Sequence, residues 1–328
     1  MPAFKIEEKQ PALANAMKIV GKHRRISHAY LFEGDSGAGQ EEMATFIAAM
    51  VFCTKEEKPC GECEHCRRIL NHDYGDVLWV EPTEGSMKID QMRAVKQDLS
   101  LSAIESHSKV FVINHAELMT TAAANSLLKF LEEPNANVHL LLLTTNRDRI
   151  LPTIQSRCQI IHFPALERQQ VIQMLIERGM GEERAQLLSA LTSDIALAET
   201  LNEQEIFSQQ IEKVWSWTQL ILKKDIRSFI LVGSEWVKLT KDRQETKRLL
   251  ALVLLYCSDL LKLKQGEGED RLIQPTLTKS YYPFVQTIAL ESLLQIMQSI
   301  AKTQAMIEHN VTVQAALEYF VLQCWGAL

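Results

Sequence analysis

Glu33-Gly34-Asp35-Ser36-Gly37-Ala38-Gly39-Gln40-Glu41 is the stretch that decides the fold of the first part of the chain. It follows an apolar run at 29–32 that predicts a short buried strand, and it precedes a helical pattern at 42–52. A strand, a glycine-rich turn and a helix in succession form the context of a phosphate-binding loop. The sequence therefore predicts the framework of a nucleotide site in this segment.

The residues that give such a loop its chemistry are replaced. In the pattern G-x-x-x-x-G-K-[ST], Gly34 and Gly39 hold the glycine positions, with Gly37 between them. Gln40 stands at the lysine position and Glu41 at the position of the magnesium-binding hydroxyl. Backbone N–H groups at a helix N-terminus still attract anions, but the lysine charge is lost and a carboxylate is added. We expect the framework of a nucleotide site without its charged chemistry.

The composition is that of a globular protein with more than one core. The chain has 328 residues, 46% hydrophobic and 23% charged, with a net charge of −6, which argues against binding nucleic acid by bulk charge. Residues 1–5 contain no apolar signal core, so we expect a cytoplasmic protein. The longest apolar run, 249–263, contains Asp259 and Lys262 and is too short to span a bilayer, so we expect a buried helix there.

Strand and helix patterns alternate up to about residue 165. Strand-like runs follow at 77–80, 110–113, 138–143 and 159–163, and helical patterns at 11–22, 89–101 and 122–133. Continuous apolar strands alternating with helices predict a parallel sheet covered on both faces. Helical patterns then follow at 166–178, 182–191 and 194–201, and from 206 onward with a loop at 265–270 and a break at 281–283. The predicted fold class is α/β plus all-α, with domains at 1–165, 166–205 and 206–328.

Four of the seven cysteines are crowded together, at Cys53, Cys60, Cys63 and Cys66. Two overlapping C-x-x-C pairs and one further thiolate supply the ligands of a tetrahedral zinc site, which would be structural because no coordination position stays open. Reduced core cysteines would lie in apolar surroundings, and a redox pair would need two thiols rather than four. His65 and His72 are possible substitute ligands, although histidines in polar loops are usually solvated.

The second half of a nucleotide site is also altered. The predicted strand ending at 113 is followed by Asn114 and His115, where an active enzyme would have Asp and Glu for magnesium and water. Glu117 remains, two residues farther on, and we interpret His115 as a polar residue at a strand end. Because two separate elements of one site have lost their charges, we predict that the chain does not hydrolyse ATP by itself.

Several segments together carry a family resemblance. They are HAYLF at 28–32, the cysteine cluster, AANSLLKFLEEP at 123–134, LLTTN at 142–146, and LPTIQSRC at 151–158, which ends in Ser156-Arg157-Cys158. Over roughly the first 165 residues the chain resembles an AAA+ module of the DNA clamp-loader type. In that family, the strand at 142–146 carries a nucleotide-sensing polar residue.

The altered loop is similar to that of the non-hydrolysing stator subunit of the bacterial DNA polymerase III clamp loader. The gamma/tau motor subunits keep the lysine, the hydroxyl and the acidic pair, and an arginine that the small helical domain presents to ATP; residues 192–198 contain no arginine. The resemblance implies gamma/tau and delta as partners, contact with the sliding clamp and primer-template DNA through the complex, a helical collar at the C-terminus, no productive ATP in the chain's own site and no membrane association.

Arg157 has two interpretations. A lone arginine usually pairs with a nearby carboxylate. The resemblance instead implies an arginine finger that reaches the γ-phosphate of ATP bound by a neighbouring subunit. From the residues themselves, we expect Ser156 to be a helix or turn cap and Cys158 a buried packing residue.

Two rival functions stay open. The chain could be an ATP-hydrolysing motor subunit with an atypical loop, and nucleotide binding by the purified chain separates this from the stator. It could also be a zinc-dependent DNA-binding protein, but the acidic balance and the closed cysteine site argue against that as the main role.

Overall fold

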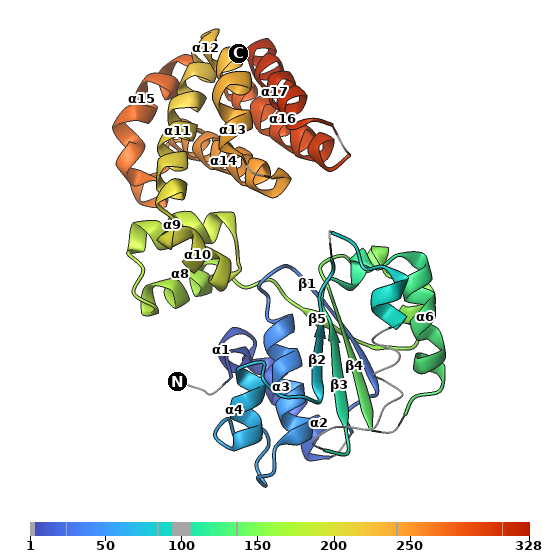
Figure 1. Ribbon diagram of the computed structural model, residues 1–328. Helices are drawn as coiled ribbons and strands as arrows, with labels where there is room; N and C mark the ends of the chain where they lie inside the picture. Colours follow the sequence, from blue (N-terminus) through green and yellow to red (C-terminus); the bar gives the residue numbers. More distant parts are fainter. Residues whose placement is uncertain are drawn as a thin grey trace. The chain divides into compact units, whose positions relative to one another are not determined.

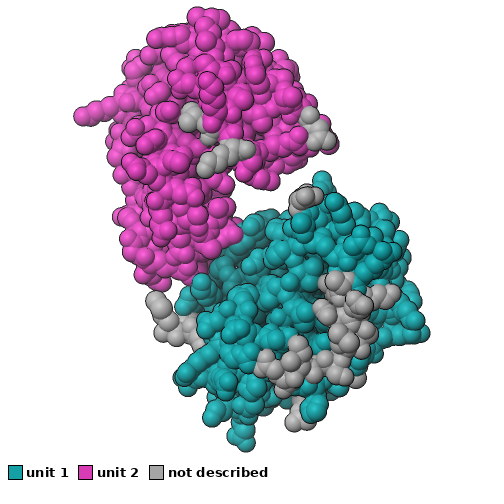
Figure 2. All heavy atoms as spheres, in the orientation of Figure 1, with its two compact units in different colours: residues 1–166 teal, residues 167–328 magenta. Residues whose placement is uncertain are grey.

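The computed structural model describes residues 4–23, 25–83, 85–93, 106–135, 137–240, 242–309 and 311–328. Within these ranges the chain forms two compact units, Met1–Leu166 and Glu167–Leu328 (Figure 2). Residues 89–93 are helical, and the remainder of the helix predicted at 89–101 lies outside the described residues.

The first unit contains a parallel sheet with the strand order β2-β3-β4-β1-β5 (Figure 1). The strands are β1 (Ala29–Gly34), β2 (Val77–Val80), β3 (Lys109–Ile113), β4 (Val138–Thr144) and β5 (Gln159–Phe163). In β1, Leu31 is in register with Leu142 of β4 on one side and with Ile160 of β5 on the other. The predicted parallel sheet is confirmed, and β1 lies inside it with the carboxyl end leading into the glycine loop.

Helices cover both faces of this sheet (Figure 1). Side chains alternate along each strand, so that Tyr30 and Phe32 join one buried cluster while Ala29 and Leu31 join the other. The first cluster includes side chains from α1 (Ile6–Lys9), α2 (Pro11–Lys22), α3 (Gln40–Phe52) and α4 (Glu64–Leu70). The second includes α6 (Thr121–Glu132) and α7 (Pro152–Gln155). Burial on both faces explains why the inner strands β1, β3 and β4 are mostly apolar.

The second unit is helical. Its first three helices are α8 (Arg168–Glu177), α9 (Glu182–Leu191) and α10 (Ile195–Glu203). They are followed by α11 (Glu205–Leu222), α12 (Arg227–Leu231), a π-helical turn at Val232–Trp236, α13 (Val237–Leu239), α14 (Arg243–Lys264), α15 (Thr278–Thr287), α16 (Leu290–Glu308) and α17 (Val313–Ala327). Trp215, Trp217 and Trp236 are buried among these helices, as expected of packing residues.

The apolar run at 249–263 lies within α14, whose residues pack in the helical core. Asp259 is fully buried there, and its carboxylate accepts hydrogen bonds from the backbone N–H groups of Ile273 and Gln274. No helix in the described ranges is long and apolar enough to cross a membrane. The predicted buried helix is confirmed.

The predicted break at 281–283 is wrong, because α15 runs through Pro283. A proline inside a helix removes one backbone hydrogen bond and costs roughly 3 kcal/mol. Tyr281 and Phe284 are buried and pack their rings against Trp215, and this packing offsets the lost bond. The chain instead leaves the helix at Ile288, before α16 begins.

Candidate functional site

Gly34 and Gly39, which hold the two glycine positions of the loop pattern, are required by the packing of the fold itself. A Cβ atom at Gly34 would lie 2.7 Å from the carbonyl oxygen of Phe163 on β5. Gly39 has φ = +117° at the start of α3, and a Cβ atom there would lie 2.8 Å from Ile6 Cδ1. These constraints hold without any ligand. They therefore account for the two glycines in a loop that lacks the lysine and the hydroxyl of a nucleotide site.

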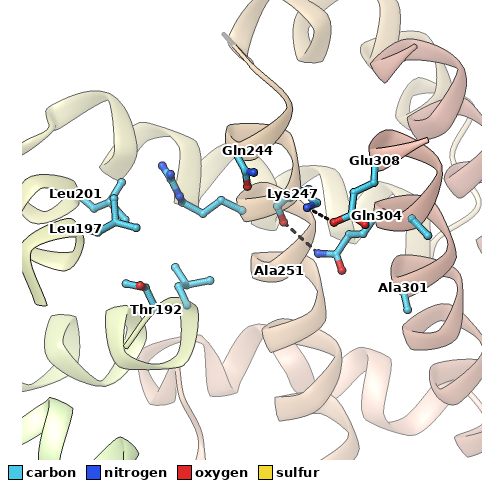
Figure 3. A pocket seen from close by; sticks show the side chains of 12 residues that line it. Thr192, Leu197, Leu201, Gln244, Lys247, Ala251, Ala301, Gln304 and Glu308 are labelled. Carbon is cyan, nitrogen blue, oxygen red and sulfur yellow. Dashed lines mark hydrogen bonds and ion pairs between the residues drawn. The ribbon is translucent and has the colours of Figure 1, made fainter. Parts of the chain in front are cut away.

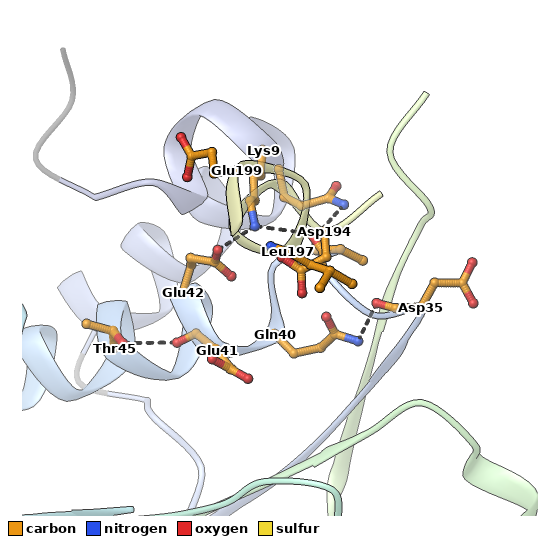
Figure 4. A network of polar contacts seen from close by, with 12 residues as sticks. Lys9, Asp35, Gln40, Glu41, Glu42, Thr45, Asp194, Leu197 and Glu199 are labelled. Carbon is orange, nitrogen blue, oxygen red and sulfur yellow. Dashed lines mark hydrogen bonds and ion pairs between the residues drawn. The ribbon is translucent and has the colours of Figure 1, made fainter. Parts of the chain in front are cut away.

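Gln40 turns its side-chain amide back into the loop. Its Nε2 donates to the carbonyl oxygens of Gly34 at 2.6 Å and Asp35 at 3.1 Å, and the residue is only 6% exposed (Figure 4). The residue at the lysine position therefore binds the loop backbone with a neutral amide. The first turn of α3 carries carboxylates at Glu41 and Glu42.

Two side chains near the N-terminus, from the end of α1 and the residue that follows it, hold two further loop carbonyls. Lys9 Nζ donates to the carbonyl oxygen of Gly37 at 3.1 Å and is ion-paired with Glu42 (Figure 4). Gln10 Nε2 donates to the carbonyl oxygen of Ala38 at 3.0 Å. Lys9 and Gln10 were not predicted as site residues, because nothing in the local pattern links them to a loop 28 residues away.

Asn114, at the end of β3, joins two carboxylates. Its Nδ2 donates to Glu41 Oε1 at 2.8 Å and to Glu81 Oε1 at 3.1 Å, while its Oδ1 accepts the backbone N–H of His115. An amide has two N–H donors and can serve both acceptors, whereas an aspartate would bring a third negative charge. The residues at 41 and 114 thus fit each other. Neither this pairing nor the role of Glu81 was predicted from the sequence.

His115 and Glu117 form a polar pair at the same edge of the sheet. His115 has φ = +50°, and its Nδ1 lies 3.4 Å from Glu117 Oε1, which also accepts from Thr145 Oγ1 at 3.0 Å. Burial acts to raise the pKa of Glu117, but hydrogen bonds from His115, its own backbone and the threonines at 144 and 145 outweigh it and lower the pKa to about 2. The hydrogen bond to Glu117 raises the pKa of His115. Thr145 lies in the segment that resembles the nucleotide-sensing strand, and it donates to this carboxylate.

Asn114→Asp is expected to destabilise the first unit by about 1–3 kcal/mol, because it replaces two hydrogen bonds with repulsion among three carboxylates. The measurement is chemical denaturation of the purified chain. Glu41→Gln is the matched second change, since its amide would donate to the newly introduced carboxylate and recover part of the loss in the double variant. Additive effects of the two substitutions would contradict the coupling between these positions.

The four clustered cysteines meet as the spacing predicted. Their sulfur atoms all lie within 4.8 Å of one another, with Cys60 to Cys66 at 3.9 Å and Cys53 to Cys63 at 4.0 Å. A tetrahedral ZnS₄ site with Zn–S bonds of about 2.3 Å requires sulfur separations of about 3.8 Å. The donor set and its spacing therefore fit one zinc ion. The left-handed backbone of Gly61, with φ = +75°, supports the tight turn between the ligands.

Hydrogen bonds and burial act oppositely on these thiols. Burial acts to raise the pKa of Cys63, but N–H and S–H hydrogen bonds, chiefly from Cys66, outweigh it and lower the pKa to about 6. Burial raises the pKa of Cys53 and Cys66. A bound cation is what would hold all four as thiolates. Neither substitute ligand belongs to the group: His65 Nδ1 contacts Tyr74 Oη at 3.0 Å, and the ring of His72 packs on Trp79.

Arg157 lies in the turn between α7 and β5, and it pairs with a carboxylate. Its Nη2 donates to Glu132 Oε1 at 2.7 Å, and its Nη1 donates to the carbonyl oxygen of Thr153 at 2.9 Å and to Ser156 Oγ at 3.3 Å. The arginine side chain is 35% exposed. Ser156 ends α7, as expected of a turn cap, whereas Cys158 is only partly buried. Burial nevertheless raises the pKa of Cys158 to about 12.

In the second unit, residues 192–198, which contain no arginine, form the connection after α9 and the first turn of α10. Asp194 Oδ1 accepts the backbone N–H of Leu197 at 3.1 Å and caps α10. Thr192 and Leu197 line a pocket of about 490 Å³ whose other walls come from α14 and α16, including the ion pair between Lys247 and Glu308 (Figure 3). This pocket lies among helices and contains none of the predicted site residues.

Comparison with known proteins points to one family. A family model described as DNA polymerase III, delta subunit, matches residues 9–167. The chain is 32% identical over 318 residues to the DNA polymerase III subunit delta′ of Bacillus subtilis, covering 97% of this chain and 96% of that protein. It is 29% identical to the subunit delta′ of Yersinia pestis, covering 90% and 86%. A solved DNA polymerase III gamma subunit-related protein from Thermotoga maritima aligns with 96% of this chain and 99% of its own, at 18% identity and a TM-score of 0.48.

Proposed function

Because this chain belongs to the family of DNA polymerase III delta′ subunits, we propose that it is the non-hydrolysing stator of a clamp loader. In this role it assembles with gamma/tau motor subunits and delta, and it acts on the sliding clamp and primer-template DNA through the complex. ATP turnover belongs to the motor subunits, and this chain supplies Arg157 to a neighbour's site.

The observation that carries the non-hydrolysing role is the state of the chain's own loop. Gln40 occupies the lysine position and binds the loop backbone, and Glu41 is tied to Asn114 from the strand that would supply the magnesium ligand. Lys9 is paired with Glu42. A triphosphate entering here would meet carboxylates where an active site has cations, so electrostatic repulsion opposes productive binding.

Arg157 has the chemistry needed for a finger. Its guanidinium is planar, permanently charged and partly exposed, so it can stabilise charge that develops on a transferred phosphoryl group. The pairing with Glu132 matches the alternative interpretation, in which this arginine pairs with a nearby carboxylate. That carboxylate, however, lies at the surface and is 51% exposed. Exposed pairs of this kind contribute about 0–1 kcal/mol, so the pairing leaves the residue available for a stronger phosphate contact.

The other parts have supporting roles in this proposal. Residues 1–165 form the AAA+ domain with its zinc module, 166–205 the lid domain and 206–328 the collar that assembles with other subunits. Zinc bound by Cys53, Cys60, Cys63 and Cys66 is structural, because four protein ligands leave no position for a substrate or water.

Nucleotide binding by the purified chain tests the proposal. We expect no saturable ATP binding and no turnover in calorimetry and phosphate-release assays, because both charged elements of the site are missing. A gamma/tau motor subunit under the same conditions is the positive control. Saturable binding accompanied by turnover would favour an ATPase motor and reject the stator.

A further inference from the structure

Glu132 occupies a position that helix stability does not explain. It is the last residue of α6, where the negative end of the helix dipole disfavours a carboxylate. The contact that compensates it is the 2.7 Å bond from Arg157 Nη2, made across 25 residues of sequence. Its neighbour Glu133 is also exposed, and the structure records no side-chain hydrogen bond or ion pair for it among the described residues. Of these two adjacent acids, Glu132 is the one directed to Arg157.

The guanidinium of Arg157 is held on two sides. Nη1 is bound to Thr153 and Ser156, at the carbonyl end of α7, and Nη2 is bound to Glu132. These contacts use three of the five N–H donors of an arginine. Within the described residues, the Nε–H and one Nη2–H have no recorded acceptor. Two donors are what one bidentate contact with a phosphate requires.

We propose that Glu132 is a positioning residue for Arg157, which fixes the guanidinium plane while leaving two donors for a phosphoryl group. This inference rests on the proposed finger function. A long arginine side chain loses rotamer entropy when it is fixed, and a partner that holds it beforehand reduces that loss at the moment of reaction. The requirement is for an acceptor oxygen at position 132, which glutamine also supplies.

The effect of losing Glu132 should be modest and specific. A partly exposed pair is worth little, so we expect Glu132→Ala to lower the part of the complex's ATP turnover that is lost in Arg157→Ala by about two- to fivefold, with KM for ATP unchanged. Glu132→Gln should retain most of the turnover. Glu133→Ala is the matched control, because it removes an adjacent exposed carboxylate without touching the arginine, and it should leave turnover unchanged.

A second readout follows the arginine directly. In the isolated chain, the Nε–H resonance of Arg157, assigned by its disappearance in Arg157→Ala, should exchange faster with solvent in Glu132→Ala. It should be unchanged in Glu133→Ala and close to the original rate in Glu132→Gln. An unchanged exchange rate in Glu132→Ala would show that Glu132 does not hold the guanidinium in solution, and it would overturn the positioning role.

Measuring Arg157→Ala in the same complexes separates the two proposals. If Arg157→Ala lowers turnover and Glu132→Ala does not, or raises it, the positioning role is overturned and the finger stands. If Glu132→Gln falls as far as Glu132→Ala, the acceptor role is overturned in the same way. If Arg157→Ala has no effect, the finger and the positioning role both fail. A fall in Arg157→Ala and Glu132→Ala together, with recovery in Glu132→Gln, supports both.

Discussion

Arg157→Ala is expected to stop ATP hydrolysis at the one motor site that this chain adjoins, while the chain still folds and assembles. Arginine fingers raise turnover by on the order of 10³–10⁵-fold, because the guanidinium offsets charge that develops on the phosphoryl group. The total ATP turnover of the complex should therefore fall by the fraction that this motor site contributes. Phosphate release by the reconstituted complex, with clamp and primed DNA present, is the measurement.

Two further variants make this result specific. Arg157→Lys keeps the charge but loses the planar fork of donors, so it should recover little of the turnover. Arg149→Ala removes another exposed arginine of the same unit and should have no effect. Unchanged hydrolysis in a complex that contains Arg157→Ala would reject the finger.

Loss of zinc is expected to have the largest effect on stability. Cys53 and Cys66 belong to the same buried cluster as α2, α3 and strands β1, β3 and β4. Without metal, four sulfur atoms within 4.8 Å of one another must be reprotonated inside or beside the core. Structural zinc contributes on the order of 10 kcal/mol of binding free energy in small zinc domains, and that energy is coupled to folding.

We therefore expect one zinc per chain by elemental analysis, and unfolding of the first unit at lower temperature after chelation or in Cys66→Ser. Cys158→Ser, at a partly buried cysteine outside the cluster, should keep the metal and the melting temperature of the first unit. Less than one tightly held zinc per chain, or a melting curve indifferent to its removal, would refute the metal assignment.

Features with a local or periodic signature could be predicted from the sequence. The strands at 77–80 and 159–163 and the helices at 11–22 and 182–191 were predicted with the bounds that the structure has. Apolar patterns depend on which faces are buried, and here the sheet is covered by helices on both of its faces. The four cysteines lie within 14 residues of one another, so their spacing alone indicated that the sulfur atoms would meet.

Features that depend on contacts between distant segments required the tertiary structure. Glu41 is bound by a residue 73 positions away, and Arg157 by one 25 positions away. Pro283 stays inside a helix because buried rings packed on Trp215 outweigh its local preference. The sequence by itself determined the sheet, the cysteine site and the absence of lysine and hydroxyl from the loop. Only the tertiary structure decided which side chains take their places, because hydrogen-bond partners are selected by proximity in space, and no local pattern encodes that proximity.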